Sequence, residues 1–170
     1  MAPATAPRLV THIYHAGRGP FRNLCELPDD EAHRILAEMR ASGRPKLTPE
    51  YLARRRATEA WLLRQAEELF GKRPSCRPLY GFLGSFGHSS DPSRPRAIRF
   101  ELASLGRVSF TLGDSMSVAS RTDRRLLGRT ALDALFAAGD VGRWDLTDAG
   151  RPARDFIEVQ IWERAHLPLL

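Results

Sequence analysis

Hydrophobic and polar positions alternate strictly near the C-terminus of the chain. In the segment 155–162, Ile157, Val159 and Ile161 fall on one face of a strand, because strand side chains alternate with a period of two. The opposite face carries Phe156, Glu158, Gln160 and Trp162. The apolar face indicates a core. The mixed face has two interpretations: a cleft that grips a flat ligand beside one negative charge, or the solvated face of an edge strand.

Four further segments have the composition of strands. The segments 9–15 and 79–86 are rich in aromatic and aliphatic residues, and 97–102 and 108–112 alternate apolar with polar positions. The short connection between the last two contains Gly106, which predicts that they form a hairpin. The polar, proline-bounded segment 87–95 is a candidate lid. The segment 113–115, Gly-Asp-Ser, leaves a strand end, where functional polar groups often collect.

Three segments have helical periodicity. The first starts near residue 28 with acidic residues, buries a stripe formed by Ala32, Ile35, Leu36 and Met39, and stops at Gly43. The second is capped by Thr48, begins at Pro49 and runs to Phe70, with Gly71 closing it. The third is short, from Ala131 to Ala138 between Thr130 and Gly139. Strands and helices together predict an α+β fold.

The longest predicted helix carries two charged residues on its apolar face. Its buried arc comprises Tyr51, Leu52, Leu62, Leu63, Ala66, Leu69 and Phe70. Arg55 and Glu59 fall inside that arc with the i, i+4 spacing of an ion pair. The pair is either structural, which we favour, or offers its guanidinium to a ligand.

Composition describes one globular domain with a basic surface. The chain has 170 residues, of which 42% are hydrophobic, and a formal charge of +6. This charge suits nucleic acid as a partner. It is carried almost entirely by arginine, which can also reflect genome composition. The candidate phosphate contacts are Arg54, Arg56, Arg96, Arg99, Arg124 and Arg125, and the alternative for each is a solvated basic surface.

Several classes of protein are excluded by missing signals. No apolar run approaches the ~20 residues of a membrane span, and residues 1–7, an expected disordered tail, lack the pattern of a signal peptide, so we expect a cytoplasmic protein. Cys25 and Cys76 are too few for a disulfide framework and have no zinc-site spacing, so no metal is expected. The chain has no phosphate-binding loop, dinucleotide-binding glycine pattern or nucleophile elbow.

Three short motifs, in this order, carry a resemblance to a known superfamily. They are Ile13-Tyr14-His15, the segment 108–114 (Val-Ser-Phe-Thr-Leu-Gly-Asp) and the segment 155–159 (Asp-Phe-Ile-Glu-Val). With them the chain resembles the ADP-ribosyltransferases, in particular the DarT-type enzymes that modify nucleic-acid bases. The patterns around residues 51–61 and 158–162 also resemble a bacterial family without an established activity.

The resemblance implies a fold and a set of residue roles. The fold would be a single domain with a split β-sheet and flanking helices, and the co-substrate would be NAD. His15 and Tyr14 would bind NAD, and Glu158 would be the catalytic residue. Arg55 and Arg77 are candidates for the NAD phosphates, and the remaining candidate contacts are Ser109, Thr111 and Gln160. The long helix 49–70 has no counterpart in that superfamily.

These observations lead to one functional hypothesis and two alternatives. The hypothesis is transfer of ADP-ribose from NAD to nucleic acid, or to protein, with Glu158, His15 and the segment 108–112 lining one cleft. The first alternative is a non-catalytic nucleic-acid-binding or regulatory protein. The second is a nuclease or phosphotransferase. A protein partner that restrains the activity is left open.

Overall fold

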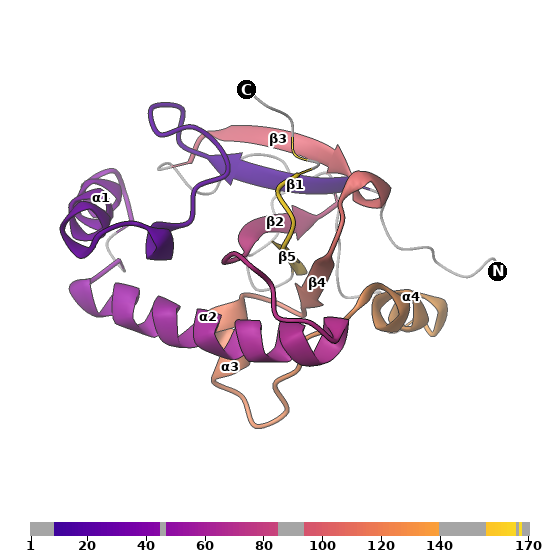
Figure 1. Cartoon of the computed structure of the whole chain (residues 1–170). Coiled ribbons are helices and arrows are strands. Elements are labelled where there is room, and N and C mark those ends of the chain that lie inside the picture. Colours follow the sequence, from indigo (N-terminus) through magenta and orange to yellow (C-terminus); the bar gives the residue numbers. More distant parts are fainter. Residues whose placement is uncertain (1–8, 45–46, 85–93, 140–155, 166, 168–170) are drawn as a thin grey trace.

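A five-stranded antiparallel sheet lies at the centre of the molecule (Figure 1). The computed structural model describes residues 9–44, 47–84, 94–139, 156–165 and 167. The strands are β1 (Leu9–Tyr14), β2 (Leu79–Leu83), β3 (Arg96–Glu101), β4 (Val108–Thr111) and β5 (Glu158–Ile161), in the spatial order β3-β1-β2-β5-β4. With the helices described below, they form a single α+β domain, as predicted.

The sheet consists of two parts with a short junction between them. β1 pairs with β3 over six residues, whereas β1 and β2 share two register pairs, Val10 with Leu83 and Thr11 with Phe82. At the junction β1 comes close to Gly81: a Cβ on this glycine would stand 2.7 Å from Cγ1 of Val10 and 3.1 Å from the backbone O of Thr11. Glycine is therefore required where β2 meets β1. β3 and β1 form one part, and β2, β5 and β4 form the other (Figure 1).

The predicted hairpin of residues 97–112 is wrong, because β3 and β4 occupy opposite edges of the sheet. A 3-10 helix, η2 (Leu102–Ser104), follows β3 and starts the crossing. The alternation had correctly identified two strands, but it does not specify their partners. β1 pairs with β3 and β5 pairs with β4. The outer edge of β4 is also covered, since the Phe110 N–H donates to Leu127 O at 2.9 Å and the reverse bond has the same length.

The helices flank the sheet. They are α1 (Asp29–Ala41), α2 (Pro49–Phe70), α3 (Ser115–Ala119) and α4 (Arg129–Ala137), with a 3-10 turn η1 (Leu24–Glu26) before α1. α2 has the predicted bounds, and Gly71 ends it in the left-handed region at φ 69°. α4 begins after Gly128, two residues before the predicted start at Ala131. α3 was not predicted. Its N-cap is Asp114, whose carboxylate accepts from Met116 N at 2.7 Å.

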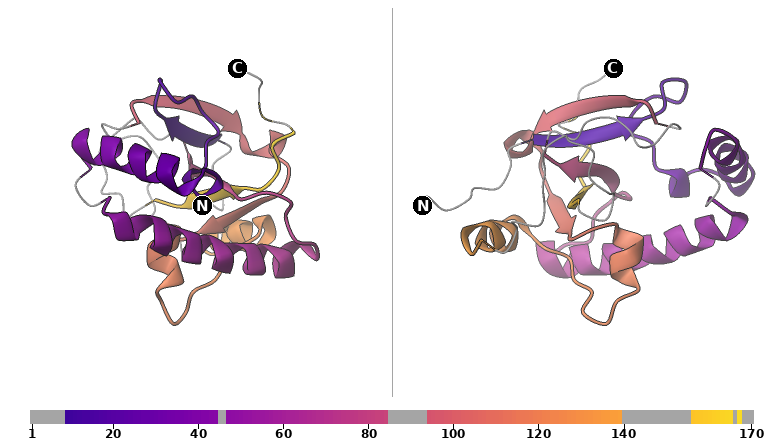
Figure 2. Two further views of the ribbon diagram at one scale, coloured as in Figure 1. Left: turned by 60° about the vertical axis from the view of Figure 1, so that its left-hand side comes forward. Right: turned by 180° about the vertical axis from the view of Figure 1, so that it is seen from behind.

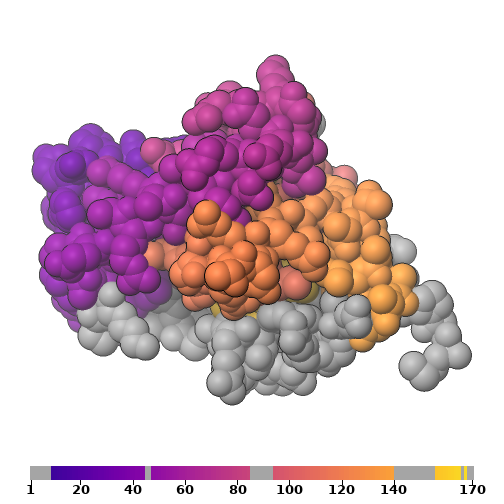
Figure 3. Space-filling model, turned by 90° about the horizontal axis from the view of Figure 1, so that it is seen from below, coloured from indigo at the N-terminus to yellow at the C-terminus, as the bar shows by residue number. Residues whose placement is uncertain are grey.

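The two sides of the sheet are packed differently. On one side, alternate residues of β4 and β5 join α4 in an apolar cluster that includes Phe110, Val159, Ile161, Leu132 and Phe136. On the other side lies α2, with α3 beside it (Figures 1 and 2). Seen from below, α2 and the segment from α3 to α4 share one surface (Figure 3). Of the predicted apolar arc of α2, Leu52, Leu62 and Ala66 are buried, Tyr51, Leu63 and Phe70 are partly buried, and Leu69 is exposed.

Some sequence predictions concern parts of the chain outside the described residues. These are the expected tail at residues 1–7, most of the candidate lid at 87–95, and the start of the last strand at residue 155. Among the helices that the structure describes, none is long and apolar enough to cross a membrane.

Candidate functional site: a buried charge network beside an arginine-lined cavity

The mixed face of the last strand is buried. β5 lies between β2 and β4 and pairs with both, so the edge-strand interpretation is wrong. Glu158 is 7% exposed and Gln160 is fully buried. A buried carboxylate and amide need hydrogen-bond partners, because leaving either without them costs about 1–3 kcal/mol or more.

Gln160 is the centre of a polar cluster between β4 and β5. Its Oε1 accepts from Ser109 Oγ at 3.0 Å, and its Nε2 donates to Thr111 Oγ1 and Glu158 Oε1, both at 3.0 Å. Trp162 Nε1 donates to Ser109 Oγ at 2.9 Å. Ser109, Thr111 and Gln160 are fully buried. These three predicted contacts of NAD therefore form a structural network that holds the Glu158 carboxylate in position.

Glu158 is surrounded by groups from several elements. Gln160 and the Ser115 hydroxyl, at the start of α3, donate to its carboxylate, and Asp114 and Arg55 are near enough to act on its charge. Burial raises the pKa of Glu158 above its ordinary value. Asp114 raises the pKa further, while Arg55 and the two hydrogen bonds lower it. The carboxyl group is therefore harder to ionise than an exposed glutamate.

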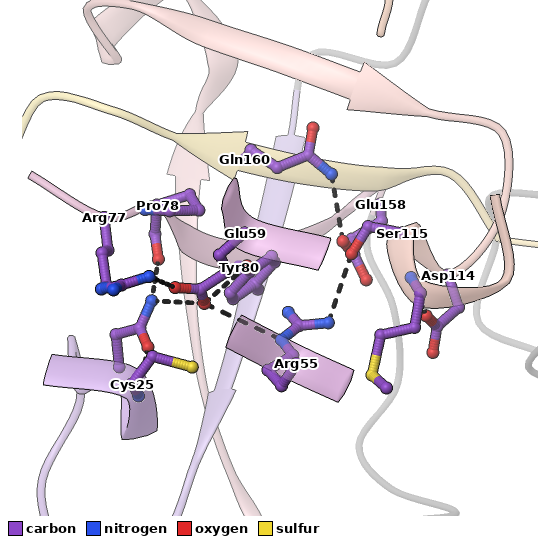
Figure 4. A network of polar contacts seen from close by, with 12 residues as sticks. Cys25, Arg55, Glu59, Arg77, Pro78, Tyr80, Asp114, Ser115, Glu158 and Gln160 are labelled. Atoms are coloured by element: carbon purple, nitrogen blue, oxygen red, sulfur yellow. Dashed lines mark hydrogen bonds and ion pairs between the residues drawn. The ribbon is translucent and has the colours of Figure 1, made fainter. Parts of the chain in front are cut away.

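Arg55 reaches this cluster from α2. Its NH1 donates to Ser115 Oγ at 3.2 Å (Figure 4). The Ser115 hydroxyl also forms a hydrogen bond with the Glu158 carboxylate and lowers its pKa, so it links the two charged groups. The guanidinium also lies 3.8 Å from the centre of the Tyr80 ring. Although burial by itself lowers the pKa of Arg55, the neighbouring Tyr80 and Glu158 raise it, and the net shift is upward. Arg55 stays charged.

Glu59, one turn further along α2, is the best-satisfied charge in this region. Arg55 Nε lies 3.8 Å from its Oε1, which is the predicted i, i+4 pair. Shorter contacts come from Arg77 NH1 at 2.9 Å, and from Asn23 Nδ2 and the Tyr80 hydroxyl at 2.8 Å each. Figure 4 shows Glu59 on one side of Arg55 and Glu158 on the other. Sequence analysis missed Asn23 and Tyr80. The alternation of Tyr80 and Phe82 in β2 could have placed Tyr80 on this face.

Next to the network is a cavity of about 580 Å³. It lies at the end of β1, between the following loop, α1 and the first turns of α2, and its lining includes Tyr14, His15, Tyr51 and Tyr80. Its arginines are Arg18, Arg22, Arg34, Arg44, Arg55 and Arg94, and its acidic residues are Glu31 and Glu38. Glu38 pairs with Arg18 at 3.3 Å and with Arg34 at 2.5 Å. The excess of arginine makes the cavity suitable for an anion.

His12 lies within β1 and His15 directly follows that strand, and the two side chains have different surroundings. His12 is buried, and its Nδ1 lies 2.7 Å from Tyr80 O while its Nε2 accepts from Phe21 N at 3.0 Å. It is therefore a fully bonded core histidine. His15 is half-buried at the cavity, and its Nδ1 accepts from Gly17 N at 3.0 Å. Its Nε2 is left to carry the proton and can donate to a ligand.

The structure brings the predicted site residues together in two groups. Tyr14, His15 and Arg55 line the cavity, whereas Glu158 and its partners on β4 and β5 lie in the buried network behind it. Arg55 belongs to both groups. The expected single cleft is thus two adjoining compartments that share one guanidinium.

The predicted phosphate contacts lie on different parts of the surface. Arg54 and Arg56 are on α2, Arg96 and Arg99 are on β3, and Arg124 and Arg125 follow α3. Arg56 pairs with Asp29 at 2.7 Å, and Arg124 NH1 donates to Ala119 O at 2.9 Å. The basic charge is distributed over three regions.

Neither a search for metal ligands nor a comparison with known proteins assigns a function to this site. Within the described part of the chain, no three His, Cys, Asp or Glu residues gather as metal ligands would. Comparison of the chain with protein-family models, with curated proteins and with solved structures gives no match.

Proposed function

We propose that the arginine-lined cavity binds NAD and that the protein, with an ADP-ribosyltransferase-like architecture, transfers ADP-ribose to an acceptor, for which nucleic acid is our first candidate. The observation that carries the proposal is the position of Arg55. Its guanidinium lines the cavity and is linked through Ser115 to Glu158. A ligand held in the cavity is therefore one side chain away from the carboxylate that the resemblance makes catalytic.

The cavity has the size and the lining for such a ligand. Its volume of about 580 Å³ is typical of small-molecule sites. Arginine is well suited to the diphosphate, because its planar fork forms paired, charge-assisted hydrogen bonds. Tyr14 and Tyr51 provide aromatic surface for the bases, and Nε2 of His15 can donate to a ribose hydroxyl.

The chemistry requires one carboxylate. Nicotinamide leaves with the electron pair of its bond to the ribose, and positive charge develops on the sugar. An ionised Glu158 in a partly dry site stabilises that charge better than water does. The acceptor then bonds to the same sugar carbon and releases a proton to solvent. Because burial raises the pKa of Glu158, this role is favoured as the pH rises through that pKa.

The test is release of nicotinamide from NAD, with and without added DNA or RNA, by wild type and by Glu158→Gln. The substitution keeps the size of the side chain and removes its charge, so we expect the rate to fall by about two orders of magnitude or more. Glu101→Gln, a change at an exposed glutamate on β3, is the matched control and should leave the rate unchanged. Equal rates in wild type and Glu158→Gln would remove Glu158 from the mechanism.

A second candidate function is non-catalytic binding of nucleic acid. The observation that favours it is that the buried Glu158 accepts hydrogen bonds from Gln160 and Ser115, as a purely structural carboxylate also would. Two measurements separate the candidates. NAD at 100 times its dissociation constant should stabilise an NAD-binding protein by about 2.7 kcal/mol. A binding protein should instead show affinity for nucleic acid that falls steeply with salt and no response to NAD.

A further inference from the structure

In the buried network, the guanidinium of Arg55 uses only part of its hydrogen-bonding capacity on the residues that the structure describes. Within the described residues its one hydrogen bond is that from NH1 to Ser115 Oγ, at 3.2 Å. Its second carboxylate neighbour, Glu59, is 3.8 Å away and is already bonded to Arg77, Asn23 and Tyr80. A guanidinium has five N–H donors. Glu59 therefore does not need Arg55, and Arg55 has donors left for the cavity that it lines.

We infer that Arg55 is a coupling residue: an anion bound in the cavity draws its guanidinium away from Ser115 and Glu158 and so changes the charge environment of Glu158. The inference rests on the proposed function for the use of Glu158 in transfer, but the coupling itself requires only an anion. It makes Arg55 a positioning residue. In the empty protein the guanidinium partly neutralises Glu158, and in the complex it binds the ligand phosphate.

The sign of the coupling follows from the groups around Glu158. Arg55 on α2, together with the hydrogen bonds from Ser115 on α3 and Gln160 on β5, lowers the pKa of Glu158. Burial and Asp114 raise it, and the other titratable neighbours of Arg55 are Tyr80 on β2 and Tyr51 and Glu59 on α2. An anion that competes for Arg55 therefore moves the pKa of Glu158 upward. Conversely, ionised Glu158 weakens anion binding, because the effect between two sites is reciprocal.

The same coupling gives a reason for the burial of Glu158. A cationic nicotinamide ribose and Arg55 cannot both be the close counter-charge of one carboxylate. Engagement of Arg55 by the diphosphate raises the pKa of Glu158, and the positive charge of the nicotinamide ribose, which replaces Arg55 beside the carboxylate, lowers it again and keeps Glu158 ionised for transfer. Binding energy from a remote part of the substrate is then used to prepare the reacting centre.

The experiment follows Glu158 directly. The carboxyl carbon resonance of Glu158, assigned by its absence in Glu158→Gln, is titrated with pH in wild type, with and without sulfate at matched ionic strength. Sulfate is a suitable probe because its charge is constant over the range of the titration. We expect the titration of Glu158 to shift to higher pH with sulfate, and the Nε resonance of Arg55 to move with the same apparent sulfate affinity. An Nε resonance of Arg55 that does not respond to sulfate would overturn the inference.

Variants make the test specific. In Arg55→Met the sulfate-dependent shift should disappear and sulfate affinity should fall about tenfold or more, since a charge-assisted contact is lost. Arg64→Met, an exposed arginine on the same helix, is the control and should behave as wild type. A full shift in Arg55→Met would show that sulfate acts on Glu158 without Arg55. If this variant does not fold, the wild-type Nε and carboxyl titrations alone decide the question.

A second arm separates this inference from the proposed function. ADP-ribose replaces sulfate in the same titrations, because its diphosphate is also fully ionised and it has no nicotinamide to release. A shift with sulfate but not with ADP-ribose would support the coupling and remove NAD as the ligand. A shift with both, without any release of nicotinamide, would support the coupling and contradict the transferase. No shift with either would overturn the coupling, whatever the activity.

Discussion

The two sides of β5 show how one short strand separates two kinds of interior. Toward α4, Val159 and Ile161 are fully or almost fully buried among leucine, valine and phenylalanine. Toward α2, Glu158 and Gln160 are equally inaccessible but lie among hydroxyls, an amide and a guanidinium. Burial alone therefore does not distinguish the two sides. The difference is that the polar side requires a specific partner for each group.

This contrast supports the location that we propose for the function. An apolar interior is stabilised in proportion to buried area and tolerates changes that preserve volume. A buried polar network is costly unless every member is satisfied, and it is less tolerant for that reason. The network here adjoins the cavity through Arg55, whereas the cluster around Phe110 and α4 stabilises the fold.

The largest effect on stability should come from removing the best-bonded charge of the polar side. Glu59→Ala removes one of the two acceptors of Asn23 Nδ2 and the partner of the Tyr80 hydroxyl, and it takes a counter-charge from the buried Arg55. We expect a loss of about 3–5 kcal/mol in the free energy of unfolding, measured by urea denaturation. Glu67→Ala, on the exposed side of α2, should change it by less than about 0.5 kcal/mol. Similar losses in the two variants would contradict the contrast between network and surface.

A smaller loss should follow when a polar group is placed on the apolar side. Val159→Thr preserves the shape of a fully buried side chain and adds a hydroxyl among carbon atoms. We expect it to cost about 1–3 kcal/mol in the free energy of unfolding. Val159→Ala measures the packing contribution at the same position. If the threonine variant unfolds at the same urea concentration as wild type, the apolar side tolerates a buried hydroxyl, and the contrast between the two sides is smaller than we infer.

The ionisation of Glu158 should make stability depend on pH. Burial raises its pKa in the folded protein above the 4.5 of a free glutamate, so the folded state holds the proton more tightly than the unfolded state. Its contribution to stability is complete below about pH 4.5 and is lost as the pH rises through the folded-state pKa. Wild type should therefore lose stability over this window relative to Glu158→Gln. Glu101→Gln should follow wild type, and a constant difference between wild type and Glu158→Gln would contradict the prediction.

Much of the fold follows from the sequence because local signals agree with it. α2 has its predicted bounds, since Pro49 and Gly71 are strong start and stop residues and the arc between them is periodic. The pairing of strands could not be predicted in this way. Alternation assigns faces, but β3 and β4 are separated by three strands whose order depends on packing across the whole sheet.

The candidate site was predictable in part for the same reason. Arg55 was identified as a charge inside the apolar arc of the long helix, and Glu158 as a charge between two aromatic residues on the mixed face of the last strand; both are buried. Their link through Ser115 was not visible, because it joins residues 55, 115 and 158 across three elements. Asn23 and Tyr80 carry no local signal of a shared partner, and Glu59 brings them together in space.

The smallest effect concerns His12, a buried polar residue of β1 that lines the cavity. Burial lowers the pKa of His12, the charge of Arg94 adds to this, and the hydrogen bond with Tyr80 O raises the pKa in part. A group that is harder to protonate in the folded state stabilises the fold above its unfolded pKa of 6.5, and this stability is lost as the pH falls through the folded-state pKa. Protonation would also end the bond that Nε2 accepts from Phe21, whose backbone is held at φ 62°. Urea denaturation between pH 5 and pH 8 should therefore show wild type losing stability below pH 6.5 relative to His12→Gln, with the exposed His33→Gln as control. A difference between wild type and His12→Gln that does not change with pH would mean that His12 does not titrate in this range.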